Sequence, residues 1–134
     1  MKINVDTNVL VRAIVADNAA QARLAQAELA QAETIVLTIP VLCELVWVLS
    51  QGYKIDSAQI VETVKNLVDS ANVVVNRPTV EAGLALLEAG GDFADGAIAY
   101  EGSWLGADEF VSFDRKAVKL LKAQSRNARV PGSA

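Results

Sequence analysis

The chain has 134 residues, the usual size of one domain, so we expect a single domain over residues 1–134. Half of the residues are hydrophobic, but no uniform apolar run is long enough to cross a membrane. Asp6, Asn8 and Arg12 interrupt the first apolar stretch, so we expect no signal peptide and a cytoplasmic location. The absence of histidine and the single cysteine exclude serine–histidine triads, ordinary zinc sites and intrachain disulfides. Any catalysis must then use carboxylates, lysines, hydroxyls or hard metal ions.

Charge is distributed unevenly along the chain. The sixteen acidic and twelve basic residues give a net charge of −4. Residues 115–134 contain six of the bases and no acid, whereas residues 1–114 contain all the acids. An acidic protein is a poor general binder of nucleic acid, because phosphate contacts need Lys and Arg. The basic C-terminal segment is therefore either a phosphate-binding surface or an ordinary solvated helix face.

Short β-branched segments alternate with amphipathic ones along the chain. Strands are expected at residues 2–5, 35–38, 72–76 and 109–113. Helices are expected at residues 7–16, 18–33, 40–50, 57–69, 79–89, 92–105 and 115–124. The tail at 125–134 adds an edge strand or is disordered. This alternation predicts an α/β fold with a parallel or mostly parallel sheet, whose functional crevice lies beyond the carboxyl ends of the strands.

Three aspartates stand at element boundaries. Asp6 and Asp114 each follow an apolar strand and precede a helix, and Asp95 lies three residues after Asp92 at the start of another helix. Each position also suits a helix cap or a first-turn acid that interacts favourably with the helix dipole. A role in helix capping is compatible with a role in a functional site, since a capping Asp92 would hold Asp95 in place.

Glu44 is the most unusual acid in the sequence. It lies in VLCELVWVL at 41–49, where the other eight residues are apolar, so we expect a helix with no polar face. An ionised carboxylate in an apolar wall is costly unless a metal ion or cationic partner compensates it. The alternative is a lone buried salt bridge or an edge position.

The four acids can converge on one crevice in a doubly wound fold. Clustered carboxylates repel one another and cannot all ionise without a cation. Oxygen-only clusters suit Mg²⁺ or Mn²⁺, and such ions can activate water for phosphodiester cleavage. This chemistry needs neither histidine nor cysteine.

Four segments carry a family resemblance over nearly the whole chain. They are VDTNVLVRAI at 5–14, PVLCELVWVL at 40–49, DFADGAIA at 92–99 and VSFDRKAVKL at 111–120. In order and spacing they resemble the PIN domain family, and more narrowly the VapC-type toxins of type II toxin–antitoxin pairs. The resemblance implies an α/β, PIN-like three-layer sandwich with a central, mostly parallel sheet flanked by helices.

The resemblance also implies an active site. Its catalytic and metal-binding residues would be Asp6, Glu44, Asp95 and Asp114. Supporting positions would be Thr7, Asn8, Asp92 and Ser112. Family members are typically Mg²⁺- or Mn²⁺-dependent endoribonucleases that cut structured RNA, form homodimers and are neutralised by a small VapB-like antitoxin. Gly96, where the family more often has Ala, and Ser112, where Thr is common, are small departures.

Surface roles follow from the remaining residues. The RNA path is expected along the basic segment, at Arg115, Lys116, Lys119 and Lys122. Cys43 is expected to be a small buried apolar residue, and Trp47 and Trp104 to be core or interface residues. Val46, Trp47 and Leu49 are candidates for a dimer or antitoxin surface.

Three rival functions stay open at this stage. An aspartate-based phosphotransfer enzyme or receiver domain also places Asp at strand ends, but a haloacid-dehalogenase-like enzyme needs a second Asp where this chain has Asn8. A catalytically silent PIN-like module would only bind RNA or a protein. A nuclease for DNA or branched substrates usually carries additional acids and helical segments, for which 134 residues leave little room.

Overall fold

The computed structural model describes residues 1–132. Contacts divide the chain into two compact units, Met1–Asn76 and Arg77–Ala134. Each unit has its own parallel strands and helices. The first contains Asp6 and Glu44, and the second contains Asp95 and Asp114.

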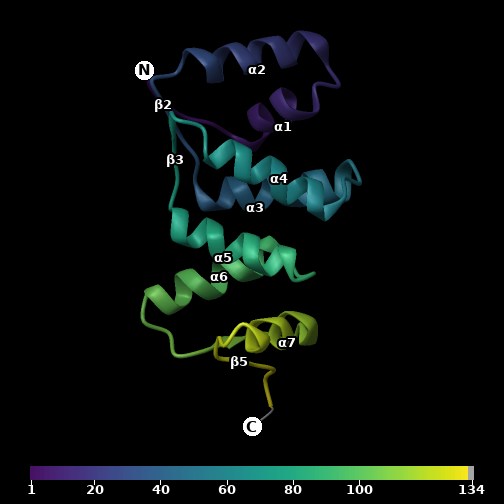
Figure 1. Cartoon of the computed structure of the whole chain (residues 1–134), viewed down its shortest axis with the longest axis vertical. Helices are drawn as coiled ribbons and strands as arrows, with labels where there is room; N and C mark the ends of the chain where they lie inside the picture. The colour runs from purple at the N-terminus through teal and green to yellow at the C-terminus, as the bar shows by residue number, and fades with distance from the viewer. Residues whose placement is uncertain (133–134) are drawn as a thin grey trace. The chain divides into compact units, whose positions relative to one another are not determined.

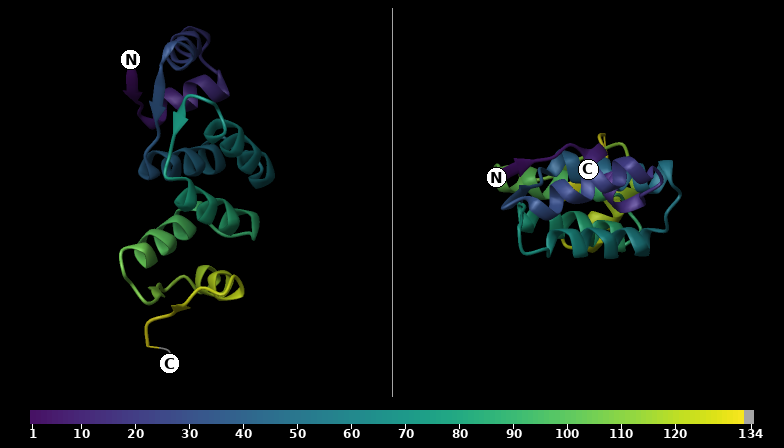
Figure 2. Two further views of the ribbon diagram at one scale, coloured as in Figure 1. Left: turned by 60° about the vertical axis from the view of Figure 1, so that its left-hand side comes forward. Right: turned by 90° about the horizontal axis from the view of Figure 1, so that it is seen from above.

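The strands of the first unit form a three-stranded parallel sheet. They are β1 (Lys2–Asn4), β2 (Thr34–Val36) and β3 (Val73–Val74), in the order β1-β2-β3. Ile3 lies opposite Ile35 and Ile35 lies opposite Val73, and the pairing of β1 with β2 can be followed in Figure 2. Because Ile35 is buried, this register turns one face of the central strand toward the core.

The helices of the first unit surround a single aliphatic core. They are α1 (Thr7–Val15), α2 (Ala19–Gln31), α3 (Ile39–Trp47), the π-helical turn η1 (Val48–Gly52) and α4 (Ser57–Val68), labelled in Figure 1 except for η1. Their fully buried side chains are Leu10, Leu42, Leu45, Leu49, Ile60 and Val64. Local side-chain chemistry favours the starts of two helices. At α2, Asn18 Oδ1 accepts a hydrogen bond from Gln21 N, and at α3, Pro40 occupies the first turn.

The second unit packs three helices with a two-stranded parallel sheet. Its elements are α5 (Arg77–Glu88), α6 (Phe93–Trp104), β4 (Phe110–Val111), α7 (Arg115–Ala123) and β5 (Ala128–Arg129). Helices α5 and α6 lie side by side (Figure 1). On the α7 side of this unit, a hydrophobic core forms from the buried residues Leu86, Ala99, Val118, Leu121 and Ala128.

The α/β class with parallel strands is confirmed. The observed strands are shorter than expected, and two of the expected ones keep only two residues. The expected α-helix over 40–50 becomes π-helical at Val48, where the hydrogen-bond spacing lengthens before Gly52 ends the segment. The tail contributes β5 beside β4, so the edge-strand prediction is correct for residues 128–129, and residues 133–134 lie outside the described part.

The prediction that Glu44 lies in an apolar wall is wrong, because Glu44 is exposed. In this helix and the π-helical turn after it, the exposed residues are Pro40, Glu44, Trp47, Gln51 and Gly52. The first four are spaced by four, three and four residues, which follows one side of a helix. The segment therefore has a solvent face although its sequence is almost entirely apolar.

The apolar residues around Glu44 need a similar correction. Trp47 and Trp104 are 63% and 76% exposed, so neither is a core residue, and an interface role for them stays a prediction. Val46 and Leu49 are buried, so they cannot form a docking surface beside Trp47. Cys43 is half-buried rather than buried.

Candidate functional site

Asp6 lies two residues beyond the end of β1, at the start of α1. Its backbone is extended and its Oδ1 accepts a hydrogen bond from Thr7 N at 2.7 Å. The carboxylate is therefore an N-cap, and its position is set by the strand before it and the helix after it. Because the backbone is fixed on both sides, Asp6 presents its carboxylate at the carboxyl edge of the first unit's sheet.

Glu44 lines a pocket of about 240 Å³ in the first unit. The other residues of this Glu44 pocket are Thr7, Asn8, Val11, Arg12, Val48 and Tyr53. Thr7 is only 3% exposed, and its Oγ1 has no hydrogen-bond partner among residues 1–132. A buried hydroxyl without a partner is costly, so this pocket wall has unused hydrogen-bonding capacity beside Glu44.

Arg12 lies in the same pocket and is held by a small polar network. Its Nη1 donates to Asp17 Oδ1 at 3.2 Å, and the Tyr53 hydroxyl donates to Asp17 Oδ2 at 3.0 Å. The hydrogen bond to Asp17 raises the pKa of Tyr53, so the phenol stays protonated as a donor. Arg12 and Tyr53 are thus fixed on the pocket wall through one shared carboxylate.

Asp92 and Asp95 stand at the start of α6 in the second unit. Asp92 is the N-cap, and its Oδ1 accepts from Ala94 N at 3.4 Å. Asp95 follows in the first turn and is half-buried. Burial, followed by the negative charges of Asp92 and Asp114, raises the pKa of Asp95 above its ordinary value. The three carboxylates therefore lie within electrostatic range of one another.

Asp114 joins β4 to α7. Its Oδ1 accepts a hydrogen bond from Ala117 N at 3.0 Å, so it caps α7 as Asp6 caps α1. The Ser112 hydroxyl accepts from Asp114 N at 3.0 Å and thereby fixes the backbone of the acid. Ser112 thus contacts the residue that it was predicted to support.

The predicted RNA-binding residues lie on one short helix. Arg115, Lys116, Lys119 and Lys122 of α7 are all exposed. The apolar face of α7 is buried, with Ala117, Val118 and Leu121 inside. The helix therefore presents its bases to solvent, beginning directly after Asp114.

The structure brings the predicted site residues together in two sets. Thr7 and Asn8 share the Glu44 pocket, and Asp92, Asp95 and Asp114 interact electrostatically within the second unit. Among residues 1–132, no three acidic or cysteine side chains come close enough together to hold a metal ion. The donor chemistry nevertheless fits a hard cation, because every candidate ligand offers oxygen and the repulsion at Asp95 is the kind that a bound cation relieves.

Arg12 and Tyr53 are pocket residues that we did not predict from the sequence. Arg12 is a base in the otherwise apolar run VLVRAIV, one helical turn after Asn8, and that spacing places both on the same side of α1. This was a usable signal. Tyr53 gave none, because it is 36 residues from Asp17 in the chain.

The chain is an α/β protein in which Asp6 and Asp114 each cap a helix that follows a parallel strand. The PIN domain family matches residues 3–123, which is most of the chain. The chain therefore belongs to the PIN domain family. No curated protein matches the sequence.

Membership in the PIN domain family implies nuclease-type activity in general. PIN domains are generally nucleases that depend on divalent metal ions, and the family suggests RNA as the bound partner. No helix within residues 1–132 has the length and apolar character that a membrane span requires.

Proposed function

We propose that this protein is a Mg²⁺- or Mn²⁺-dependent endoribonuclease whose catalytic and metal-binding residues are Asp6, Glu44, Asp95 and Asp114. The observation that carries the proposal is the PIN family match over residues 3–123, which covers all four acids, with Asp6, Asp95 and Asp114 at helix starts. The half-buried carboxylate of Asp95 also lies in the field of two further carboxylates, and burial and these charges raise its pKa. An arrangement that disfavours its own ionised state suits a site that binds a cation.

Each residue has a distinct role in this proposal. Asp6, Asp95 and Asp114 would hold the metal most directly, and Glu44 would complete the cluster or position the attacking water. Asp92 holds the first turn of α6 through its cap, and Ser112 fixes the backbone of Asp114. When bound, a divalent ion at such carboxylates supplies an activated water and neutralises charge on the leaving oxygen. Cleavage would leave a 3′-hydroxyl and a 5′-phosphate.

The biological setting is proposed from the sequence resemblance to VapC-type toxins. We infer a cytoplasmic, homodimeric toxin that cuts structured RNA and is neutralised by a small VapB-like antitoxin. The two described units would then belong to one PIN-like domain over residues 1–134, in agreement with a single family match that spans both. The exposed Trp47 and Trp104 are the candidate interface residues.

Cleavage of total cellular RNA by the purified protein tests the proposal. We expect cleavage with Mg²⁺ or Mn²⁺, none with EDTA, and a loss of at least about a hundredfold for Asp6→Asn, because removal of one carboxylate weakens both metal affinity and charge stabilisation. The matched control is Glu62→Gln, an exposed acid of α4, which should cleave like the wild type.

Three results would contradict the proposal. Cleavage that survives Asp6→Asn indicates a contaminating nuclease. Products that end in a 2′,3′-cyclic phosphate indicate attack by the ribose hydroxyl rather than by water. Absence of cleavage together with RNA binding that Asp95→Asn leaves unchanged indicates a silent binding module.

A further inference from the structure

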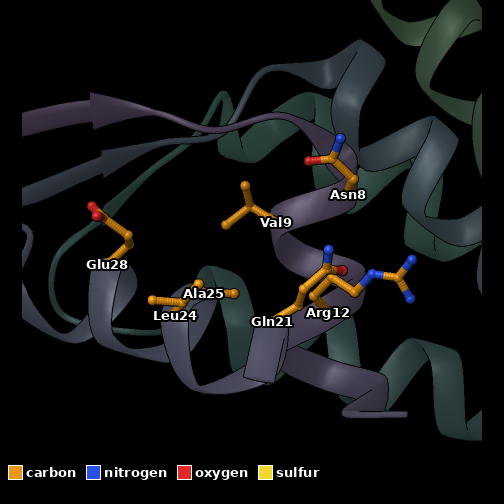
Figure 3. A pocket seen from close by; sticks show the side chains of 7 residues that line it. All are labelled: Asn8, Val9, Arg12, Gln21, Leu24, Ala25 and Glu28. Carbon is orange, nitrogen blue, oxygen red and sulfur yellow. The ribbon is translucent and has the colours of Figure 1, made fainter. Parts of the chain in front are cut away.

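Arg12 lies between two openings on the surface of the first unit. It lines the Glu44 pocket, and it also lines a groove of about 410 Å³ between α1 and α2. Figure 3 shows this groove, with the guanidinium of Arg12 extending away from the apolar side chains of Val9 and Leu24. Arg12 is thus anchored on a helix while its side chain remains 38% exposed.

The contacts of Arg12 fix its direction. Asp17 accepts from Arg12 through one carboxylate oxygen and from the Tyr53 hydroxyl through the other. Asp17 is therefore held by two partners, one on α1 and one in the segment after η1. Within the described residues no ion pair joins Arg12 to Glu44, although both line the same pocket.

The backbone beside this network is held in an unfavourable conformation at two points. Ala16, directly before Asp17, and Lys54, directly after Tyr53, both have a φ of 56°. Residues with a Cβ seldom adopt this left-handed conformation, and it persists only where surrounding contacts impose it. Ala16 is also the C-cap of α1 and donates its N–H to the Arg12 carbonyl oxygen, so the end of this helix places Asp17 close to Arg12.

A surface ion pair by itself contributes little to stability, so stability alone does not explain this arrangement. A guanidinium with a fixed direction is suited to bind an oxyanion, because its planar fork matches the geometry of a phosphate. The pocket also contains Glu44, Asn8 and the unpartnered hydroxyl of Thr7, three of the predicted site residues.

We propose that Arg12 binds a backbone phosphate of the RNA at the Glu44 pocket, with Asp17 and Tyr53 as positioning residues. This inference rests on the proposed ribonuclease function. It adds a phosphate contact in the acidic first unit, separate from the basic helix α7.

Binding of a fluorescently labelled RNA hairpin to the full chain tests the inference. Anisotropy is measured in EDTA, so that no cleavage occurs, at several KCl concentrations. For Arg12→Gln we expect about tenfold weaker binding and a salt slope lower by about 0.7–1, the value of one lost phosphate contact. Arg12→Lys keeps the charge and should retain the slope with an intermediate affinity. Arg23→Gln, which removes an exposed base of α2, should stay within about twofold of the wild type.

Tyr53→Phe tests the positioning role without removing the charge. It deletes the hydroxyl that holds Asp17, so we expect about threefold weaker binding with an unchanged salt slope. This variant also keeps the inference testable if thermal unfolding shows that Arg12→Gln does not fold.

Wild-type affinity and slope in folded Arg12→Gln would overturn the inference. So would equal losses in Arg12→Gln and Arg23→Gln, because they would indicate a general charge effect. Cleavage assays on Asp95→Asn separate this failure from that of the proposed function. If cleavage requires Asp95 but binding ignores Arg12, only the phosphate contact is wrong, and if cleavage ignores Asp95, the ribonuclease proposal itself fails.

Discussion

Asp6, Asp92 and Asp114 each accept a backbone hydrogen bond at the first turn of a helix. This local role does not compete with a role as metal ligand. A carboxylate offers about four lone-pair positions, and one backbone N–H occupies only one of them. The cap instead restricts the side chain to one orientation, which lowers the entropy cost of binding a ligand there. Capping is thus compatible with the proposed role of these carboxylates as metal ligands.

Asp95→Asn should stabilise the free protein at neutral pH. Because the folded-state pKa of Asp95 is raised, its protonated form favours folding fully below about pH 3.9, and this contribution is lost as pH rises through the folded-state value. Asparagine has no charge to lose. We expect a gain of less than about 1 kcal/mol at pH 7, since the side chain is partly exposed and water screens the repulsion. The difference should vanish near pH 3 in urea unfolding of the two proteins in EDTA.

Two comparisons make the Asp95→Asn result specific. Glu101→Gln replaces an exposed acid on the same helix and should give no pH-dependent difference. Adding Mg²⁺ should then raise the thermal midpoint of the wild type more than that of Asp95→Asn, because a ligand that binds the native state stabilises it. A variant less stable than the wild type at pH 7 in EDTA would contradict the electrostatic account.

The close contact between α5 and α6 explains Gly96. A Cβ at this position would lie 2.5 Å from the Ala82 carbonyl oxygen and 2.9 Å from the Leu86 Cβ. Backbone oxygen cannot move aside as a flexible side chain can. Glycine therefore suits position 96 because these two helices approach very closely in this chain.

Gly96→Ala should destabilise the protein by about 1–2 kcal/mol, because an overpacking cost of about 2–3 kcal/mol exceeds the gain of about 1 kcal/mol in helix propensity. The matched control is Gly102→Ala in the same helix, where an added Cβ meets nothing within 4 Å. That variant should gain about 0.5–1 kcal/mol from helix propensity alone. Chemical denaturation measures both, and equal effects of the two substitutions would mean that the close approach is not what selects glycine at position 96.

Helix positions followed well from local sequence, because apolar periodicity and capping residues act within a few positions of each other. Asn18, Pro40 and Asp92 mark helix starts as expected. Strand lengths followed less well, since a residue belongs to a strand only if its neighbour strand offers partners in register. The π-helical turn at Val48–Gly52 had no signal in the sequence pattern.

The separation of charge along the whole chain supports the proposed RNA path along α7. All sixteen acids precede residue 115, and the exposed bases of α7 begin directly after Asp114. Phosphates are repelled by the acidic part of the chain and attracted by this helix. RNA affinity should therefore depend on where bases are removed and not only on how many.

The double variant Lys119→Glu, Lys122→Glu should bind RNA at least about tenfold more weakly, because it reverses two exposed charges on the proposed RNA-binding face of α7. Metal binding, measured by calorimetry, should remain. Lys2→Glu combined with Arg23→Glu makes the same change in net charge on exposed residues of the first unit and should weaken RNA binding less. Equal losses in the two double variants, both folded by circular dichroism, would refute a specific path along α7.

The sequence by itself determined the α/β class, the helix starts and the identity of the acids, because these depend on patterns of nearby residues and on side-chain chemistry. Tertiary structure alone decided that Glu44 is exposed, that Gly96 admits no Cβ, and that Arg12, Asp17 and Tyr53 form one network. The physical reason is distance along the chain. Hydrogen bonds and close approaches between residues far apart in sequence follow from how whole elements pack, and no local periodicity records them.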